Sequence, residues 1–220
     1  MHVLSRLTRT LTKPLFLCLS AMVLAVAGLA AAVMKSETVG QADALANQEA
    51  YGRATDHGTE WSFHITDLGA SHTVWLVTAA AALFLVAFRH WRGAIALLVA
   101  VASTQLVVDV LKVAVERPRP DHALTEANGF SFPSAHSATS MAVYATLTLL
   151  AARAVNGRLR VAIAIAGALV VVAIGLTRIH LGAHYPTDVL AGWLTGAVIV
   201  LGSWTLARRI PLPRLLLARG

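Results

Sequence analysis

The sequence predicts an all-α integral membrane protein, a bundle of six transmembrane helices with both chain ends in the cytoplasm. Two properties of its composition point this way: 57% of the 220 residues are hydrophobic and only 13% are charged, and the mean hydropathy is +0.67. Such values are typical of membrane proteins. The third observation is a sorting of basic residues between loops. Neither a repeat nor a composition shift divides the chain, so residues 1–220 are expected to form one domain.

The first apolar segment, residues 14–34, contains no charged residue. At 1.5 Å per residue, a helix of this length crosses a hydrocarbon core of about 30 Å. Because the bilayer core offers no water, each span must close its own backbone hydrogen bonds, and segments rich in Leu, Ala and Val do so as helices. The other expected spans are 70–88, 93–115, 137–152, 161–177 and 187–207.

Basic residues are sorted to one side of the predicted membrane. Four segments carry basic residues and no acidic ones. They lie before the first span, between the second and third, between the fourth and fifth, and after the last. Their basic residues are Arg6, Arg9, Lys13, Arg89, Arg92, Arg153, Arg158, Arg160, Arg208, Arg209, Arg214 and Arg219. Since Lys and Arg are retained on the cytoplasmic side, both termini are predicted inside. A cleavable signal peptide is the alternative interpretation of the first segment, and its loss would leave five spans in unchanged orientation.

The longest polar segment, residues 36–71, then lies outside, where either a short interfacial helix or a plain linker fits its sequence. The net charge of +7 does not indicate nucleic-acid binding, because the basic residues are dispersed between apolar segments. The single cysteine, Cys18, excludes an intrachain disulfide.

Charged and histidine side chains gather at the outer ends of four expected spans, the third to the sixth. A charge within a span costs roughly 2.5 to 3.5 kcal/mol on insertion scales, so such residues need a functional reason. If the helices form a bundle, these ends can converge on one outer pocket. The residues are Lys112, Arg119, His136, Arg178, His184 and Asp188.

The permanent cations in this set select an anion. The planar forks of Arg119 and Arg178 match phosphate oxygens, and Lys112 adds a third positive charge. Ser134 and Ala135 lead directly into the fourth span. Its free backbone N–H groups and helix dipole would point at the same anion. A phosphoryl group fits this arrangement.

Two histidines supply candidates for the chemistry. His184 and Asp188 are four residues apart, with Pro186 between them as a good first residue of a helix. Asp188 bonded to one ring nitrogen would fix the tautomer and leave the other nitrogen to attack phosphorus. His136, on another helix, is placed to protonate the departing oxygen.

Three ordered blocks carry a family resemblance. Lys112 is followed after six residues by Arg119-Pro120, then comes Pro133-Ser134-Ala135-His136, then Arg178 with His184 and Asp188 at fixed spacing. This pattern, from Lys112 to Asp188, resembles the signature of the type 2 phosphatidic acid phosphatase superfamily. Its members include lipid phosphate phosphatases and undecaprenyl-diphosphatase-like enzymes. Two positions depart from the pattern: Ala135 stands where glycine is usual, and Thr177 where serine is usual.

The resemblance implies a metal-independent phosphatase without a cofactor. It implies that phosphate is bound by Lys112, Arg119, Ser134, Ala135 and Arg178. It also implies that His136 is the acid, that His184 is the nucleophile that becomes a phosphohistidine, and that Asp188 orients His184. The expected substrate is a lipid phosphomonoester or diphosphate in the plasma or inner membrane, such as phosphatidic acid, phosphatidylglycerol phosphate or a polyprenyl diphosphate, hydrolysed on the extracytoplasmic side. Other membrane lipids are its expected partners, and nucleic acid is not.

Alternative interpretations remain for parts of this set. A transporter of anionic lipids or solutes would also use intramembrane cations, and a vanadate-dependent haloperoxidase would use a similar pocket. His180, His184 and Asp188 have a spacing that also suits metal ligands. The charged residues of the loop between the first two blocks are expected to be solvated: Glu116, Arg117, Asp121, His122 and Glu126.

Overall fold

The computed structural model describes residues 2–125 and 128–209, with the side chains of residues 2–14 excepted. Within these ranges all regular structure is helical, which confirms the all-α prediction. Predictions for Arg6, Arg9, Lys13, Glu126, Arg214 and Arg219 fall on side chains outside this description. The elements are α1 (His2–Lys35), α2 (Glu37–Gly52), α3 (Asp56–Asp67), α4 (Ser71–Ala87), α5 (Trp91–Val115), α6 (Ala135–Ser140), the π-helical turn η1 (Met141–Ala145), α7 (Thr146–Ala154), α8 (Gly157–His180) and α9 (Pro186–Arg209).

In the described part of the chain, four helical stretches are long and apolar enough to cross a membrane: Leu15–Lys35, Trp91–Val115, Gly157–His180 and Pro186–Arg209. A fifth candidate is α4 taken together with α3, from which it is bent by 43°. The expected span 137–152 corresponds to α6, η1 and α7, which follow one another with helical backbone at both junctions. Each of these three pieces is short. The count of six spans therefore stays a prediction.

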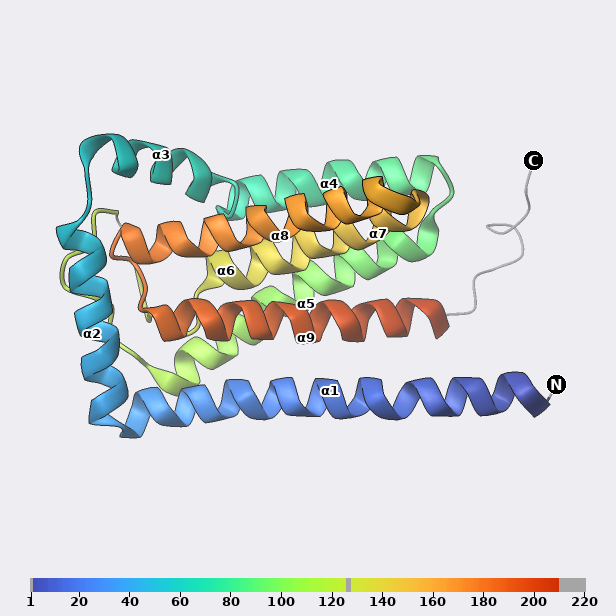
Figure 1. Cartoon of the computed structure of the whole chain (residues 1–220), viewed down its shortest axis with the longest axis horizontal. Helices are drawn as coiled ribbons and strands as arrows, with labels where there is room; N and C mark the ends of the chain where they lie inside the picture. Colours follow the sequence, from blue (N-terminus) through green and yellow to red (C-terminus); the bar gives the residue numbers. More distant parts are fainter. Residues whose placement is uncertain (1, 126–127, 210–220) are drawn as a thin grey trace.

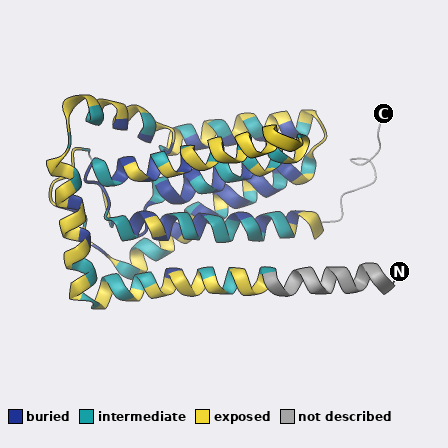
Figure 2. Ribbon diagram, in the orientation of Figure 1, coloured by how far each residue is buried: buried dark blue, intermediate teal, exposed yellow. Residues whose placement is uncertain are grey.

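Helix α9 lies in the middle of the bundle, where α1, α5 and α6 all pack against it (Figure 1). The buried side chains that join α4, α5, η1 and α9 include Leu97, Val101, Val143 and Val200. Figure 2 shows buried residues concentrated on the inner faces and exposed ones on the outer faces of these helices. Many exposed side chains are large and apolar, such as Leu83 and Leu169. This distribution suits a bundle whose outer surface faces lipid.

Close contact between α9 and α6 depends on two glycines of α9. A Cβ atom on Gly192 would lie 2.6 Å from the backbone oxygen of Ser134, and one on Gly196 would lie 2.5 Å from that of Ala138. Both distances are too short for a real side chain. The small-residue spacing seen in the sequence thus brings the start of α6 directly against the start of α9.

The two ends of the bundle carry different residues. At one end the Arg153 guanidinium lies 4.4 Å from the ring centroid of Trp204, and that of Arg208 lies 5.6 Å from the same ring. At the other end α2 crosses the bundle, and α3 lies beside it (Figure 1). The polar segment 36–71 is therefore mostly helical rather than a plain linker. The connection 181–185 and the described parts of the connection 116–134 reach this same end.

Candidate active site

The predicted residues come from six parts of the chain that meet at the end crossed by α2. Lys112 lies in the last turn of α5, and Arg178 in the last turn of α8. Arg119 and His184 lie in the two connections, and His136 and Asp188 lie in the first turns of α6 and α9. The structure thus brings together side chains that are up to 76 positions apart in the sequence, from Lys112 to Asp188.

The turn that carries His184 is shaped by the end of α8. The backbone N–H groups of Ala183 and His184 both donate to the carbonyl of Arg178, at 3.0 and 3.2 Å. Gly182 adopts a left-handed conformation with φ of 67°, and a Cβ there would lie 2.4 Å from His122 O. Glycine is therefore required at this position. Helix α9 then begins at Pro186, as predicted.

His184 and Asp188 are both buried, with 2% and 0% of their surface exposed. Asp188 Oδ2 accepts a 3.0 Å hydrogen bond from the backbone N–H of Tyr185, which fixes the carboxylate in the first turn of α9. The same oxygen lies 3.6 Å from His184 Nδ1. That separation is longer than a hydrogen bond but short enough for strong attraction. The predicted pair is thus present, with the carboxylate facing the ring.

The other ring nitrogen of His184 faces Arg119. Arg119 Nη1 lies 3.2 Å from His184 Nε2 and 2.8 Å from Ala183 O. Because arginine only donates, Nε2 accepts in this contact, and the ring hydrogen belongs on Nδ1, toward Asp188. Nε2 therefore carries the lone pair that a nucleophile needs.

Burial lowers the pKa of His184 to about 4; Asp188 opposes this effect, and the positive charges of Arg119 and Arg178 add to it. The imidazole is consequently neutral at pH 7. Burial also lowers the pKa of Arg119, while Asp188 partly offsets this. Arg119 remains a cation at any physiological pH because its ordinary value is so high.

Lys112 and Arg119 converge on one loop. Lys112 Nζ donates to the carbonyl of Phe130, and Arg119 Nη2 donates to the same oxygen at 3.3 Å. Further bonds run from Arg119 Nε to Gly129 O at 2.9 Å and from Nη2 to Asn128 O at 3.0 Å. The loop thereby joins Lys112 to Arg119, which lies beside His184.

Arg178 lies on the α3 side of the site and is only 4% exposed. Its Nη1 donates to Thr66 Oγ1 at 2.9 Å. Its buried Nε has no hydrogen-bond partner among the described residues. A buried guanidinium with an unused donor is suited to receive an anionic oxygen.

Ser134 and Ala135 form the start of α6. The Ser134 hydroxyl accepts hydrogen bonds from Ser137 N at 3.4 Å and Ser137 Oγ at 3.0 Å, which caps the helix. Ala135 is not among the described residues with positive φ, so replacing the usual glycine needs no unusual backbone here. The N–H groups of its first turn have no intrahelical acceptor.

His136 in this first turn stands close to Gly69, in the turn between α3 and α4, and α6 packs against α8. A Cβ atom on Gly69 would lie 3.2 Å from His136 Cδ2 and 2.7 Å from Ile174 Cγ2. Gly69 therefore leaves the space that the imidazole ring occupies. The ionisable groups whose positive forms act on His136 are Arg178, His184, Arg119 and Lys112.

One prediction for the loop between the first two blocks is wrong. Arg117 is not solvated: it is 8% exposed. Its guanidinium forms ion pairs with Asp188 and with Asp43 of α2. Proline follows both Arg117 and Arg119, and residues before proline are usually extended. Alternate side chains of an extended segment share a face, a signal that could have placed Arg117 beside Arg119. Glu116, Asp121 and His122 are exposed, as predicted.

Residues of α2 and α3 were also missed. Asp43, Asn47 and Thr66 are buried, and each bonds to part of the site. Asn47 Nδ2 donates to His184 O at 3.3 Å, and Thr66 accepts from Arg178. Asp43 and Asn47 have helical spacing, but the sequence gives no sign of their partners, which are far away along the chain.

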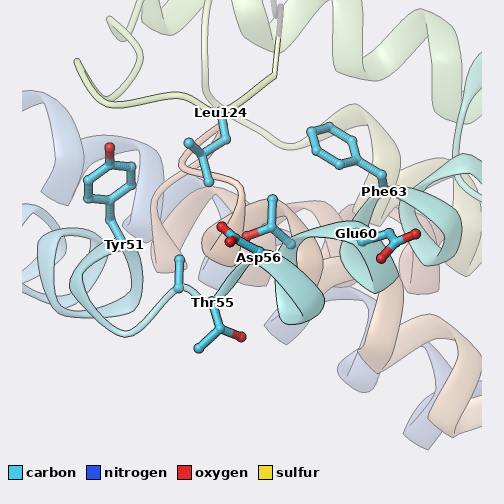
Figure 3. Close-up of a pocket in the computed structure, with 8 residues that line it drawn as sticks. Tyr51, Thr55, Asp56, Glu60, Phe63 and Leu124 are labelled. Atoms are coloured by element: carbon cyan, nitrogen blue, oxygen red, sulfur yellow. The ribbon is translucent and has the colours of Figure 1, made fainter.

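A cavity of about 540 Å³ opens between α2, α3 and residue Leu124. Figure 3 shows Tyr51 on one side of it and Phe63 on the other, with Asp56 between them and Glu60 near Phe63. None of the predicted site residues lines this cavity. It is separate from the cationic cluster, and its carboxylates do not suit a phosphate.

Metal-ligand candidates were also compared with the structure. Among the described residues, no three or more His, Cys, Asp or Glu side chains are grouped to hold a metal ion. His180 Nε2 lies 3.5 Å from Thr59 Oγ1 of α3. Its ring therefore contacts α3, whereas the ring of His184 faces Arg119 and Asp188.

Comparisons with known proteins agree with this geometry. The profile of the PAP2 superfamily matches residues 93–211. Phosphatidylglycerophosphatase B of Bacillus subtilis is 35% identical over 141 residues, 61% of this chain and 68% of the relative. Lipid A 1-phosphatase of Rhizobium etli is 38% identical over 128 residues, 53% of this chain and 48% of the relative. The chain thus spans about half the length of the latter.

Solved structures show the same fold. The crystal structure of a transmembrane PAP2-type phosphatidylglycerolphosphate phosphatase from Bacillus subtilis has a TM-score of 0.81 and 27% identity, covering 88% of this chain and 97% of that one. That of Aquifex aeolicus LpxE has a TM-score of 0.60 and 23% identity, covering 72% and 92%. Fold and site together define a phosphatase that is a multi-pass membrane protein. The chain belongs to the PAP2 superfamily, and the resemblance seen in its three sequence blocks is confirmed.

Proposed function

We propose that this enzyme hydrolyses a lipid phosphate on the extracytoplasmic side of the cell membrane through a phosphohistidine on His184. The observation that carries this proposal is the position of His184 Nε2. It lies 3.2 Å from Arg119 Nη1, while the opposite nitrogen faces Asp188. A phosphoryl group bound to Arg119 would therefore lie against the lone pair of a neutral imidazole.

The proposed reaction has two steps. In the first, the Nε2 lone pair attacks phosphorus, the P–O bond to the lipid breaks, and the leaving oxygen takes a proton from His136. The negative charge of the bound phosphoryl group would keep His136 protonated against burial and the surrounding cations. In the second, water attacks the phosphohistidine, His136 takes one proton of the water, and the P–N bond breaks to release phosphate. Asp188 stabilises the positive ring in between. The cations of Lys112, Arg119 and Arg178, with the first turn of α6 at Ser134 and Ala135, would stabilise charge on the phosphoryl oxygens.

An apolar groove supports a lipid as the substrate. It has a volume of about 320 Å³ and lies between α1, α5 and α9, lined by residues such as Val26, Val107 and Leu111. Leu111 directly precedes Lys112, so the groove reaches the level of the phosphate site. A lipid tail in the groove and its headgroup at Lys112 would match the chemistry of both regions.

The relatives support a glycerophospholipid phosphate as the first compound to test. Phosphatidylglycerophosphatase B matches this chain in sequence, and a phosphatidylglycerolphosphate phosphatase matches it in fold. Phosphatidic acid and polyprenyl diphosphates share the phosphoryl group that the site would bind. We also propose six spans with cytoplasmic termini, because the Arg-rich end of the bundle lies opposite the site.

The test is phosphate release by the purified protein in detergent, over a panel of phosphatidylglycerol phosphate, phosphatidic acid and undecaprenyl diphosphate. We expect turnover with at least one lipid in the presence of EDTA. His184→Ala should abolish release and the acid-labile, alkali-stable phosphoenzyme, whereas His57→Ala, an exposed histidine of α3, should keep both. Full activity of His184→Ala would refute the mechanism. Lipid flux in proteoliposomes without phosphate release would indicate a transporter instead.

A further inference from the structure

Helix α2 contacts the site through polar residues. Of its residues, all described, only Asp43 and Asn47 are buried. They are four positions apart and therefore share one face. A helix that docks mainly by apolar packing buries an apolar stripe, and α2 does not. Its position across the end of the bundle (Figure 1) is thus explained by what Asp43 and Asn47 bind.

Arg117 joins Asp43 to Asp188. Its Nη1 donates to Asp188 Oδ1 at 2.6 Å and to Thr187 Oγ1 at 2.8 Å. Its Nη2 donates to Asp43 Oδ2 at 2.8 Å. Asp43 also accepts from the backbone N–H and the hydroxyl of Thr187. Arg117, Asp43 and Asp188 are 8%, 4% and 0% exposed, so this is a buried cluster with every charge paired.

This arrangement divides the oxygens of Asp188 between two tasks. Oδ1 is held by Arg117, while Oδ2 is oriented by the N–H of Tyr185 and faces His184 Nδ1. Rotation of the carboxylate would break the bond to Arg117. The guanidinium therefore fixes the plane in which Asp188 meets the imidazole.

The second carboxylate matters for charge. Arg117 and Asp188 alone would be a neutral pair, and the pull of Asp188 on a positive His184 ring would be largely cancelled. With Asp43, one positive and two negative groups leave a net charge of −1. The other charged or titratable groups that face His184 are Arg119, Arg178 and His136, and Lys112 lies beyond them. The carboxylate cluster is thus the negative side of a site that is otherwise cationic.

We propose that Asp43 and Arg117 are positioning residues for the phosphatase reaction, which hold Asp188 against His184 and keep the cluster negative, making α2 part of the catalytic unit. This inference rests on the proposed function. The bonds of both side chains go to each other, to Thr187 or to Asp188, so both would act through Asp188. Loss of either should therefore lower kcat on the order of 10²-fold, as for a misplaced catalytic group, with little change in KM.

Three variants test the proposal through the acid limb of the pH profile of kcat/KM. Asp43→Asn makes the cluster neutral, so a protonated His184 is less stable and the limb should move to lower pH, on the order of one unit. The double variant Asp43→Asn with Arg117→Gln restores the charge of −1, and its limb should return to the wild-type position. Arg117→Lys preserves charge but not the forked geometry, so kcat should fall while the limb stays. The lipid phosphate titrates identically for every variant, so differences between variants report the enzyme.

The exposed pair of Glu49 in α2 and Arg53, the residue directly after α2, at 2.6 Å, provides the matched control. Glu49→Gln and Arg53→Gln should leave kcat and the limb unchanged. The positioning role would be overturned if the acid limb of Asp43→Asn lay at the wild-type pH. It would also be overturned if the acid limb of the double variant were shifted as far as that of Asp43→Asn. If the double variant does not fold, the test is the difference between Asp43→Asn, whose acid limb should move, and Arg117→Lys, whose acid limb should not. If the wild-type protein releases no phosphate from any lipid, the proposed function itself has failed; active wild-type protein with unmoved limbs refutes only this inference.

Discussion

Arg119 Nη1 lies 3.2 Å from His184 Nε2, the nitrogen proposed to attack phosphorus. The same guanidinium is held by the carbonyls of Ala183, Asn128, Gly129 and Phe130. A side chain with so many backbone partners has little freedom to move. The group that would bind the phosphoryl oxygens and the group that would attack are therefore placed relative to each other before a substrate arrives.

Replacement of Arg119 should consequently affect the reaction more than binding. We expect Arg119→Ala to lower kcat by about 10² to 10³-fold, the usual loss for one donor to a developing charge. Arg119→Lys should also be impaired, because a single ammonium cannot bond the loop and the phosphoryl group together. Steady-state kinetics on the preferred lipid, with Arg53→Ala as control, measures both. Wild-type kcat in Arg119→Lys would contradict a forked contact.

The low pKa of His184 predicts the acid side of the activity profile. Protonation removes the Nε2 lone pair, so the contribution of His184 to kcat/KM should be constant from pH 7 down to about 5 and decline as the pH falls through about 4. The ionisation of the lipid phosphate is measured separately by ³¹P NMR, and the pH profile of kcat/KM is corrected for it. A limb near pH 6.5 that remains after this correction would mean that His184 is not desolvated.

The same pKa links stability to pH. A histidine with a folded-state pKa of about 4 binds its proton first in the unfolded chain, where the value is about 6.5. The melting temperature should thus fall as the pH is lowered from about 6.5 toward 4. His184→Gln removes this group, so the melting curve of that variant should depend less on pH over the same interval. Equal pH dependence in the two proteins would refute the link.

His136 as general acid predicts a dependence on the leaving group. Loss of an acid normally costs about 10² to 10⁴-fold, but a good leaving group such as p-nitrophenolate hardly needs a proton. His136→Gln should therefore retain more of its phosphoenzyme formation with p-nitrophenyl phosphate than with an alkyl phosphate lipid. His184→Ala should lose phosphoenzyme formation with both substrates equally. An equal loss in His136→Gln would assign that residue to phosphate binding instead.

Close packing of α9 on α6 predicts a strong effect for a single methyl group. In Gly196→Ala the new Cβ would stand 2.5 Å from Ala138 O, so the helices must separate. Overpacking of this kind costs about 1 to 3 kcal/mol, and the shift should also lower activity, because these helices carry His136 and Asp188. Gly202→Ala on the same helix meets nothing within 4 Å and should be neutral in thermal unfolding and turnover.

The proposed membrane topology can be tested by cysteine labelling. With Cys18 replaced by Ala, the variants Glu49→Cys and Arg158→Cys place one thiol at each end of the bundle. In sealed cells, a membrane-impermeant maleimide should label residue 49 directly and residue 158 only after permeabilisation. The reverse pattern would put the site in the cytoplasm.

The sequence was informative where function depends on local pattern. Hydropathy predicted the helices, and the spacing of His184 and Asp188 around Pro186 predicted a carboxylate that faces the ring, which the 3.6 Å separation agrees with. Arg117 was assigned wrongly because it looked like one more loop cation. Its partner Asp43 is 74 positions away, and no periodicity within either segment encodes a pairing over that distance.

The polar segment 36–71 illustrates the same limit. Composition allowed a helix or a linker, and the choice depends on bonds such as that of Asn47 to the carbonyl of His184, 137 positions later. Such contacts form only when the bundle is assembled. These are tertiary contacts, and local helix propensity does not encode them.

The contact between Asp43 and Thr187 joins residues 144 positions apart. During synthesis, α2 is made well before α9. Until α9 joins the other helices, Arg117 lacks Asp188 and Thr187, and His184 lacks the carboxylate that faces its ring. A folding intermediate without α9 in place therefore lacks the pair that the proposed reaction needs. Docking of α2 and assembly of the site are one event in this fold.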